Sequence, residues 1–187
     1  MNFKDALITR YNLSETDWES TMVSFHVEPV KSKSYFLKEG QISRKLGFIK
    51  SGLFRSFIWD QNGNDITTHF FLPGTVLLSI ESFNNQVPSK ENIAALECSE
   101  LLIVTYDDLH KLYQTVPAWQ QICKDVAEMK NQVLNTRSIQ FQTLTAKERY
   151  KKFCETYPEI MQKVTLRHIA SYLGIDSATL SRIRKNI

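Results

Sequence analysis

Hydroxyl, guanidinium and ammonium side chains near the end of the chain are spaced so that they share one face of a helix. The outward positions of this helix are Ser177, Ala178, Ser181, Arg182 and Lys185. Leu180 and Ile183 fall on the opposite face, which we expect to be buried. Guanidinium and hydroxyl groups donate hydrogen bonds to base edges, and cationic groups neutralise phosphates. The spacing therefore predicts that the outward face lies in the major groove of double-stranded DNA.

The segment before this helix has the pattern needed to position it. A helical apolar face is formed by Leu166, Ile169, Ala170 and Leu173. Gly174 follows, where a helix end needs a residue that tolerates positive φ, and Asp176 or Ser177 can cap the next helix. We therefore predict a helix-turn-helix. An ordinary two-helix corner with a glycine at the bend is the alternative, but it does not account for the polar and basic outward face.

Charge is concentrated at this end of the chain rather than spread over it. The formal net charge of the 187 residues is only +3, so a general affinity for polyanions does not follow. Residues 163–187, however, contain a single acid, Asp176, and the cations Lys163, Arg167, Arg182, Arg184 and Lys185. A local basic cluster of this kind is typical of a nucleic-acid-binding module.

Other kinds of chemistry find little support in the sequence. Cys98, Cys123 and Cys154 are widely spaced in apolar contexts, so we expect buried free thiols and no metal site. Nucleophile–base pairs, paired carboxylates and phosphate-binding loops do not stand out, and the sequence predicts that the chain is not an enzyme. Glu97 and Glu100 are interpreted as solvated acids. The N-terminus does not resemble a signal peptide and no apolar run approaches about 18 residues, which predicts a cytoplasmic protein without a membrane partner.

The first part of the chain reads as short helices followed by many short strands. Residues 2–10 and 14–21 are amphipathic, and Ser14 can cap the second segment. From about residue 25, aromatic and β-branched runs alternate with turn signals, and the runs 53–59 and 66–71 flank Asn62-Gly63, a strong hairpin signal. Residues 93–98 and 101–106 look like two further strands. Such regular spacing predicts an antiparallel β-barrel or jelly roll.

A long helix is expected after residue 107, where the periodicity becomes helical again. Residues 108–115 form one helix, and Pro117 can begin the next. An apolar seam with steps of three and four is formed by Trp119, Ile122, Val126, Met129 and Val133. A seam of this length favours a pair of helices in a homodimer, and a single helix-turn-helix also reads too few base pairs alone. The alternative is that the seam packs on the protein's own barrel.

The remaining residues complete an α+β fold. Residues 144–156 read as a helix with a capping box at Thr145 and Glu148, ended by Tyr157-Pro158. Only seven residues, 158–164, separate it from the helix-turn-helix, and the sequence ends soon after that motif, so we expect little or no β-hairpin wing. The predicted domains are a sensory β-barrel with short N-terminal helices at 1–116, a dimerisation helix at 117–142 and a DNA-binding domain at 143–187.

This arrangement resembles the Crp/Fnr family of bacterial transcription regulators, in the form common in the Bacteroidetes. The most specific matches lie in residues 146–150, 157–158, 169–175 and 179–184. The resemblance implies a cyclic-nucleotide-binding-like barrel. In cAMP-binding members a Gly-Glu pair holds the ribose and an Arg-Ser pair holds the phosphate. These pairs fall here on Leu78-Ser79 and Ser89-Lys90, so both ligand-specific charges are missing.

The resemblance therefore implies that neither cAMP nor cGMP is the effector, and the candidates for contacting another ligand are Ser79, Ser89 and Lys90. The cysteines do not cluster near the N-terminus as in members with an iron–sulfur cluster, so no such cluster is expected. The four histidines are scattered and do not suggest haem. No cofactor is evident from the sequence.

The resemblance also assigns roles in DNA binding. The positions that carry Arg, Glu and Arg in the family are here Ser177, Ala178 and Arg182, and Arg182 is the candidate for a bidentate guanine contact. Ala178 in place of the acid implies a different half-site. The other candidate contacts to bases or phosphates are Thr179, Ser181, Arg184, Lys185, Thr165 and Arg167. For Arg184 and Lys185 the alternative is a solvated basic tail.

The sequence as a whole predicts a homodimeric DNA-binding transcription regulator with an unknown effector. The resemblance adds RNA polymerase as a partner. An effector in the barrel would shift the populations of two arrangements of the long helix pair, and without one the dimer would bind DNA constitutively. The competing hypothesis is a small-molecule-binding module that acts through protein contacts without reading DNA. Replacing Arg182 would distinguish the two hypotheses.

Overall fold

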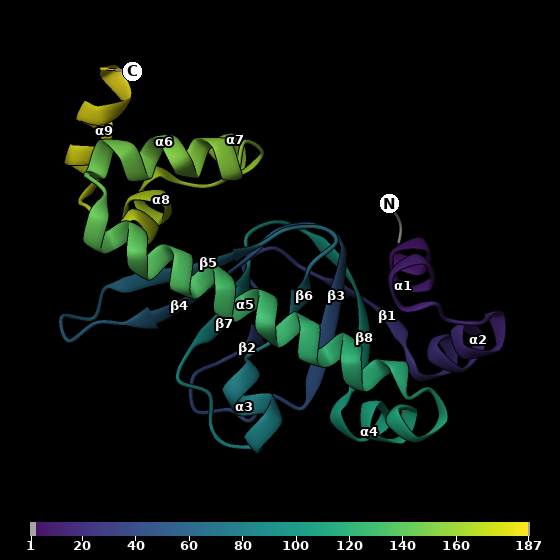
Figure 1. The fold of residues 1–187 in the computed structure, drawn as a ribbon. Coiled ribbons are helices and arrows are strands. Elements are labelled where there is room, and N and C mark those ends of the chain that lie inside the picture. The colour runs from purple at the N-terminus through teal and green to yellow at the C-terminus, as the bar shows by residue number, and fades with distance from the viewer. Residues whose placement is uncertain (1–2, 187) are drawn as a thin grey trace. The chain divides into compact units, whose positions relative to one another are not determined.

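The computed structural model describes residues 3–186 and has the predicted α+β architecture (Figure 1). Its strands are β1 (His26–Val30), β2 (Tyr35–Leu37), β3 (Lys45–Ser51), β4 (Phe54–Trp59), β5 (Asp65–Phe71), β6 (Val76–Leu77), β7 (Asn92–Ala95) and β8 (Ser99–Thr105). Its helices are α1 (Phe3–Tyr11), α2 (Glu15–Ser24), α3 (Ile80–Asn85), α4 (Tyr106–Thr115), α5 (Ala118–Thr143), α6 (Ala146–Thr156), α7 (Ile160–Lys163), α8 (Leu166–Leu173) and α9 (Ser177–Lys185).

The strands form a sandwich of two four-stranded sheets. One sheet has the order β1-β8-β3-β6 and the other the order β2-β7-β4-β5. The central pair of the first sheet, β3 and β8, is antiparallel, with Leu46 opposite Val104 and Phe48 opposite Leu102. A fully apolar core is made by Leu37, Ile49, Phe54, Phe71, Leu77, Ile93, Ala95, Leu101 and Ile103. The predicted antiparallel β fold is therefore confirmed.

The predicted hairpin is formed by β4 and β5. Its loop, residues 60–64, is closed by the bond from the Asp60 amide to the Asn64 carbonyl at 2.9 Å. The Asp60 carboxylate accepts from the backbone amides of Asn62 and Asn64, both at 2.8 Å. Gly63 has φ +76°, a conformation that glycine adopts without the steric cost paid by other residues. The loop is thus fixed by bonds among its own residues.

A second apolar cluster joins the short helices to the sheet β1-β8-β3-β6. Its buried members include Phe25, Leu46, Leu102, Leu112 and Val116. Trp119 and Ile122 at the start of α5 belong to this cluster and are only 2% and 4% exposed. The Trp119 indole Nε1 donates to Thr21 Oγ1 at 2.9 Å. The prediction that these two residues form a dimer seam is therefore wrong, because the chain's own barrel already buries them.

The three cysteines are free, but they are not all buried. Cys98 lies in the turn between β7 and β8 and is exposed, which corrects the prediction of three buried thiols. Cys123 and Cys154 are partly buried. Among residues 3–186, no helix combines the length and the apolar composition that crossing a membrane requires.

The chain divides into two compact units. Within the described residues, unit 1 comprises residues 3–56 and 70–129, and unit 2 comprises residues 57–69 and 130–186. Unit 1 therefore contains most of the sandwich and the first half of α5. Unit 2 contains the end of the β4–β5 hairpin, the second half of α5 and the C-terminal helices. These units cut across the predicted domain boundaries because the hairpin end packs with the helices.

Candidate nucleic-acid interface

Capping interactions set the geometry of α8 and α9. Thr165 is the N-cap of α8 and accepts from the His168 amide. Gly174 ends α8 with φ +66°, and its amide bonds to the carbonyls of Ala170 and Ser171. Asp176 is the N-cap of α9 and accepts from the Thr179 amide at 2.8 Å. The predicted helix-turn-helix is present, and Asp176 rather than Ser177 provides the cap.

Apolar packing holds α9 beneath its outward face. Leu180 and Ile169 are fully buried, and Ala170 is 1% exposed, which allows the helices to approach closely. α8 packs against both α9 and α6. Phe153 of α6 and Ile160 of α7 are 3% and 0% exposed. α9 is therefore anchored along one side and leaves the opposite side accessible.

The outward face of α9 has the residues that the sequence placed there. Ser177, Ala178, Arg182, Arg184 and Lys185 are exposed, whereas Thr179 and Ser181 are partly buried. Internal hydrogen bonds occupy the two partly buried hydroxyls. Thr179 Oγ1 donates to Asp176 Oδ2 at 2.7 Å, and Ser181 Oγ donates to the Ser177 carbonyl at 2.9 Å. Arg182 Nη2 donates to Thr179 Oγ1 at 3.1 Å, which aligns the guanidinium along the helix surface.

Arg184 lies beside α6 as well as at the surface. Burial and a hydrogen bond with Cys154 raise the pKa of the Tyr150 phenol, and the neighbouring Arg184 guanidinium opposes that rise. Tyr150 is 6% exposed, so Arg184 reaches a residue of the α6 packing surface. Arg184 and Lys185 are both exposed, so the phosphate contact and the alternative of a solvated basic tail both stay predictions.

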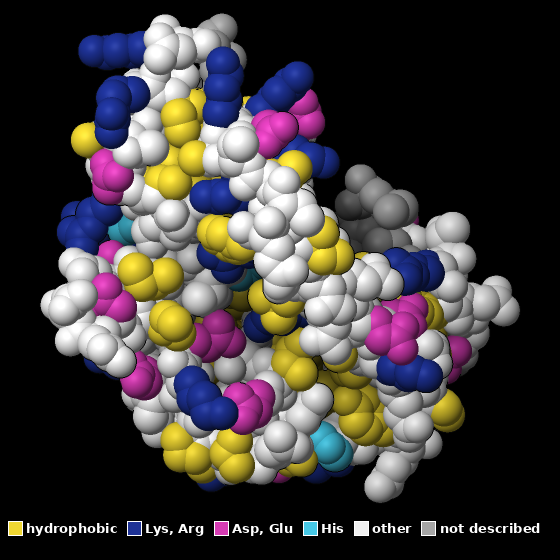
Figure 2. Space-filling view, turned by 60° about the vertical axis from the view of Figure 1, so that its left-hand side comes forward, with side chains coloured by type: hydrophobic (Ala, Val, Ile, Leu, Met, Phe, Trp, Pro, Cys, Tyr) yellow, Lys and Arg dark blue, Asp and Glu magenta, His cyan; other side chains and the backbone are white. Residues whose placement is uncertain are grey.

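Cations surround the C-terminal helices beyond those named from the sequence. Lys147, Lys151 and Lys152 of α6 are exposed. The Lys147 ammonium donates to the Asn186 carbonyl at 3.4 Å, next to the end of α9. Figure 2 shows Lys and Arg side chains spread over the upper part of the view, where the C-terminal helices lie. Together these residues give the end of unit 2 a surface suited to a polyanion.

Arg137 of α5 was missed by the sequence analysis. Its guanidinium donates to the carbonyls of Thr68 at 2.8 Å, Thr67 at 3.3 Å and Tyr172 at 2.8 Å. It also lies over the Tyr172 ring, 4.4 Å from the centroid. Burial lowers the pKa of Arg137, and the nearby tyrosines oppose that shift. One side chain of α5 thus binds both β5 and the C-terminal end of α8, two elements that are remote from it in the sequence.

Phe141 supports the turn of the helix-turn-helix from α5. A Cβ atom placed on Gly174 would lie 2.6 Å from Phe141 Cε1, closer than such atoms approach. The Arg149 guanidinium lies over the Phe141 ring, 4.9 Å from its centroid, and Arg149 Nε donates to the Leu173 carbonyl at 3.2 Å. The glycine is therefore needed for its φ and for the space that Phe141 fills. The spacing of Arg137 and Phe141, four residues apart on one helix, was the available sequence signal.

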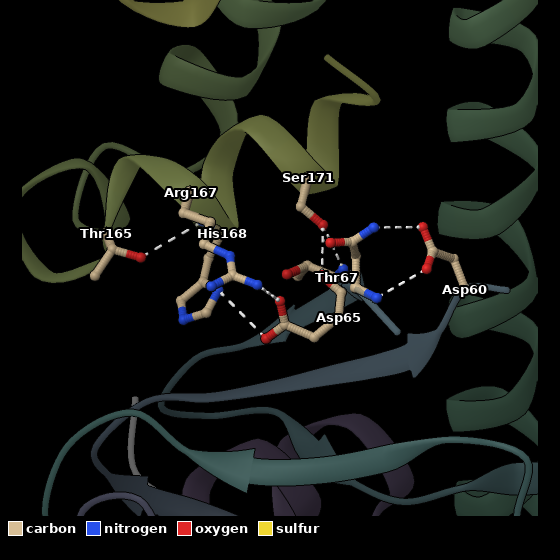
Figure 3. Close-up of polar contacts among 8 residues, drawn as sticks. Asp60, Asp65, Thr67, Thr165, Arg167, His168 and Ser171 are labelled. Carbon is tan, nitrogen blue, oxygen red and sulfur yellow. Dashed lines mark hydrogen bonds and ion pairs between the residues drawn. The ribbon is translucent and has the colours of Figure 1, made fainter. Parts of the chain in front are cut away.

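The end of the hairpin contacts α8 directly (Figure 3). Ser171 Oγ accepts from the Thr67 amide at 2.7 Å and donates to the Asp65 carbonyl at 3.2 Å. Arg167 Nη2 lies 3.2 Å from Asp65 Oδ1, and His168 Nδ1 lies 4.0 Å from Asp65 Oδ2. Two predicted phosphate contacts are therefore engaged within the protein, because Thr165 caps α8 and Arg167 pairs with Asp65.

The predicted ligand contacts are only partly brought together. Ser79 and Ser89 are buried, and their hydroxyl oxygens are 3.3 Å apart. Lys90 instead bonds to Glu81 at 2.7 Å, and its side chain is 78% exposed. Within residues 3–186, no three His, Cys, Asp or Glu side chains gather as metal ligands. The structure thus has the neutral hydroxyl of Ser89 at the position where the family resemblance puts the phosphate-binding arginine, and the hydroxyl of Ser79 at the position of the ribose-binding glutamate.

Comparisons with known proteins identify the class of fold. Residues 27–116 match the family model described as cyclic nucleotide-binding domain. A curated relative, an anaerobic regulatory protein from Pasteurella multocida, is 25% identical over 169 residues, which cover 83% of this chain. The chain spans about 60% of the length of that relative.

Three solved structures have the same fold over most of the chain. They are the c-di-GMP-responsive regulator CLP of Xanthomonas campestris (TM-score 0.73, 13% identity, 92% of this chain and 91% of that chain), FixK2 of Bradyrhizobium japonicum (0.74, 16%, 87% and 83%) and a crp/fnr family transcriptional regulator from Eubacterium rectale (0.73, 16%, 94% and 83%).

The chain therefore has the fold of Crp/Fnr regulators, and residues 27–116 are similar to a cyclic nucleotide-binding domain. The resemblance and the fold class predicted from the sequence are confirmed. The proteins matched over most of the chain are regulators rather than enzymes, in agreement with the sequence prediction.

Proposed function

We propose that this protein is a sequence-specific DNA-binding transcription regulator of the Crp/Fnr type that acts as a cytoplasmic homodimer. The observation that carries the proposal is the anchored, exposed face of α9. Leu180 is fully buried, whereas Ser177, Ala178 and Arg182 remain exposed around it. A helix held in this way presents hydrogen-bond donors at the spacing that a major groove requires.

Individual roles follow from where the side chains lie. Arg182 is the proposed guanine reader, with Ser177 and Ala178 beside it at the exposed start of α9. Thr179 and Ser181 are in internal hydrogen bonds, so in this proposal they orient Arg182 and the helix more than they read bases. Arg184 and Lys185 are the proposed phosphate contacts.

The proposed dimer uses the part of the α5 seam that the barrel does not bury. Val126 and Val133 are partly buried, and Met129 is 43% exposed. Leu134 and Ile139 add exposed apolar surface further along α5, at 41% and 60%. Burying Val126, Met129 and Val133 against a second copy would remove the seam from water and pair two recognition helices.

The proposed effector is neither cAMP nor cGMP. A cyclic phosphate needs a compensating cation, but the position that matches the phosphate-binding arginine carries the hydroxyl of Ser89, and the next residue, Lys90, is paired with Glu81. One similar structure is named as c-di-GMP-responsive, so c-di-GMP belongs in the set of candidate effectors. RNA polymerase is the proposed partner when the protein acts on transcription.

The test is a selection of bound sequences from a random DNA pool, repeated with Arg182→Ala and with Lys111→Ala. Lys111 is a matched control because it removes one exposed cation from α4, in unit 1. We expect a palindromic motif with half-sites about one helical turn apart for the wild type and for Lys111→Ala. Arg182→Ala should weaken binding to that motif by about 1–3 kcal/mol and relax one base position.

Effector candidates are then added to the same selection. If no sequence is enriched with or without cAMP, cGMP, c-di-GMP or cell extract, the DNA-binding proposal is wrong. The protein would then act through protein contacts. A motif that appears only with cAMP would contradict the proposed ligand specificity and leave the DNA-binding role standing.

A further inference from the structure

The first helix of the helix-turn-helix is held by the hairpin through contacts on one of its faces. Ser171 exchanges hydrogen bonds with the backbone of Asp65 and Thr67, and Arg137 joins the Tyr172 carbonyl to those of Thr67 and Thr68. All these residues belong to unit 2, so they form one packed arrangement. The hairpin backbone is therefore fixed next to α8 independently of the Asp65 side chain.

The Asp65 carboxylate lies beside the first turn of α8, at Arg167 and His168. This is the turn where Thr165 and Arg167 are the candidate phosphate contacts. The Asp65 side chain is 12% exposed, and the Arg167 side chain paired with it is 67% exposed. The carboxylate is thus held in place by its surroundings, while the guanidinium sits at the surface on a long, flexible stem. Figure 3 shows the two side chains facing one another, and because Arg167 is the exposed partner on the longer stem, it is the one that can turn toward another anion.

We propose that Asp65 competes with a DNA phosphate for Arg167 and so lowers the affinity of the protein for DNA. This inference rests on the DNA-binding function proposed above. A carboxylate and a phosphate oxygen both accept charge-assisted hydrogen bonds from a guanidinium. While Arg167 is paired with Asp65, its charge is already compensated, and it displaces fewer counterions from DNA.

The competition gives the hairpin a direct effect on DNA binding. Any change that moves β5 away from α8 breaks the bonds of Ser171 and removes Asp65 from Arg167 at the same time. The freed guanidinium then becomes an additional phosphate contact. An effector that acts on the β4–β5 hairpin would therefore raise affinity for all DNA sequences, separately from the base contacts of α9.

The experiment compares wild type with Asp65→Asn on the DNA motif that the wild type selects, over a range of salt concentrations. Asn keeps the size of the side chain and removes its charge. We expect Asp65→Asn to bind more tightly and to show a steeper salt dependence, with a slope larger by about 0.9 for one additional phosphate contact. The ratio of the two affinities should then fall about 3.5-fold between 50 and 200 mM salt.

Asp60→Asn is the matched control. It makes the same charge change in the same hairpin, but the Asp60 carboxylate bonds to Asn62 and Asn64 within the loop. Asn at this position can still accept from the two backbone amides through its Oδ1 and loses only the bond from the Asn64 side chain, so we expect the salt slope to stay within error of the wild type.

The decisive comparison repeats Asp65→Asn in an Arg167→Gln background. If Asp65 acts by competing for Arg167, the gain in affinity and the steeper slope disappear when Arg167 is absent. Equal or weaker binding by Asp65→Asn, or a gain that persists without Arg167, overturns the competition while leaving the DNA-binding function intact. Failure of every variant to bind any selected sequence overturns the proposed function and the inference that depends on it.

Discussion

The two halves of α5 are held by different kinds of interaction. Trp119 and Ile122 in the first half are buried in an apolar cluster. Further along the helix, Arg137 donates to three carbonyls and Phe141 fills the space beside Gly174. Apolar burial has little directional preference, whereas a guanidinium bridge depends on the position of each acceptor. The first half should therefore tolerate conservative replacements that the second half does not.

Trp119→Ala, in the first half of α5, should lower the free energy of unfolding more than any other change considered for this helix. It removes a side chain that is 98% buried, together with the bond to Thr21, and we expect unfolding free energy to fall by about 3–5 kcal/mol. Ile122→Leu, which conserves volume in the same cluster, should cost less than about 1.5 kcal/mol. Urea unfolding followed by tryptophan fluorescence and circular dichroism measures both. A loss for Ile122→Leu as large as that for Trp119→Ala would contradict non-directional burial.

Acidification should destabilise the packing of β5 against the second half of α5, because His69 of β5 lies close enough to Lys130 and Arg137 for their charges to lower its pKa. Burial, with a smaller contribution from the charges of Lys130 and Arg137 of α5, lowers the pKa of His69 to about 4. The unfolded chain binds this proton near pH 6.5. The stabilising contribution is thus present above pH 6.5 and is lost as the pH falls toward 4, a change of about 3 kcal/mol.

Unfolding measured between pH 7 and pH 4 tests this expectation, with His69→Gln for comparison. The variant should show a flatter pH profile across this window because it has no group to titrate there. A profile that is unchanged by His69→Gln would show that other groups cause the acid sensitivity.

Arg137→Lys tests whether the second half of α5 depends on the direction of the hydrogen bonds that Arg137 donates. Lysine keeps the charge, but its single ammonium cannot reproduce the fork that reaches Thr67, Thr68 and Tyr172. We expect a loss of about 2–3 kcal/mol, since a buried carbonyl without its donor is costly. Hydrogen exchange of the α8 amides measures the local effect. If Arg137→Lys protects α8 as well as the wild type does, charge alone accounts for the bridge.

Of the effects at Trp119, His69, Arg137 and Gly174, the loss of stability caused by Gly174→Ala should be the smallest. This loss has two separable causes. The positive φ of 66° costs a residue with a side chain about 1–2 kcal/mol, and the new Cβ also meets Phe141. In a Phe141→Leu background we expect the steric part of the loss to diminish and the φ part to remain. Thermal unfolding of the four proteins in this cycle gives both parts. An additive cycle would mean that Phe141 moves aside without cost.

The sequence by itself determined the features that depend on neighbours within a few residues. Thr145 and Glu148 form the predicted capping box, Gly174 ends α8, and Asn62-Gly63 closes the hairpin. Each of these is stabilised by bonds between residues at most four apart, so the local pattern contains the necessary information. The family resemblance and the fold class followed from the same local signals taken in order.

Only the tertiary structure decided which distant residues meet. Sequence periodicity gave Trp119 and Val133 the same place in the seam, but the barrel buries Trp119 and leaves Val133 partly accessible. Arg167 was expected to face phosphate, yet Asp65, about a hundred positions earlier, lies beside it. Arg137 meets Thr68 of β5 and Tyr172 of α8, which lie 69 positions before it and 35 positions after it. A side chain's type and spacing specify which interactions it can make, whereas the folded chain fixes which partner is within reach.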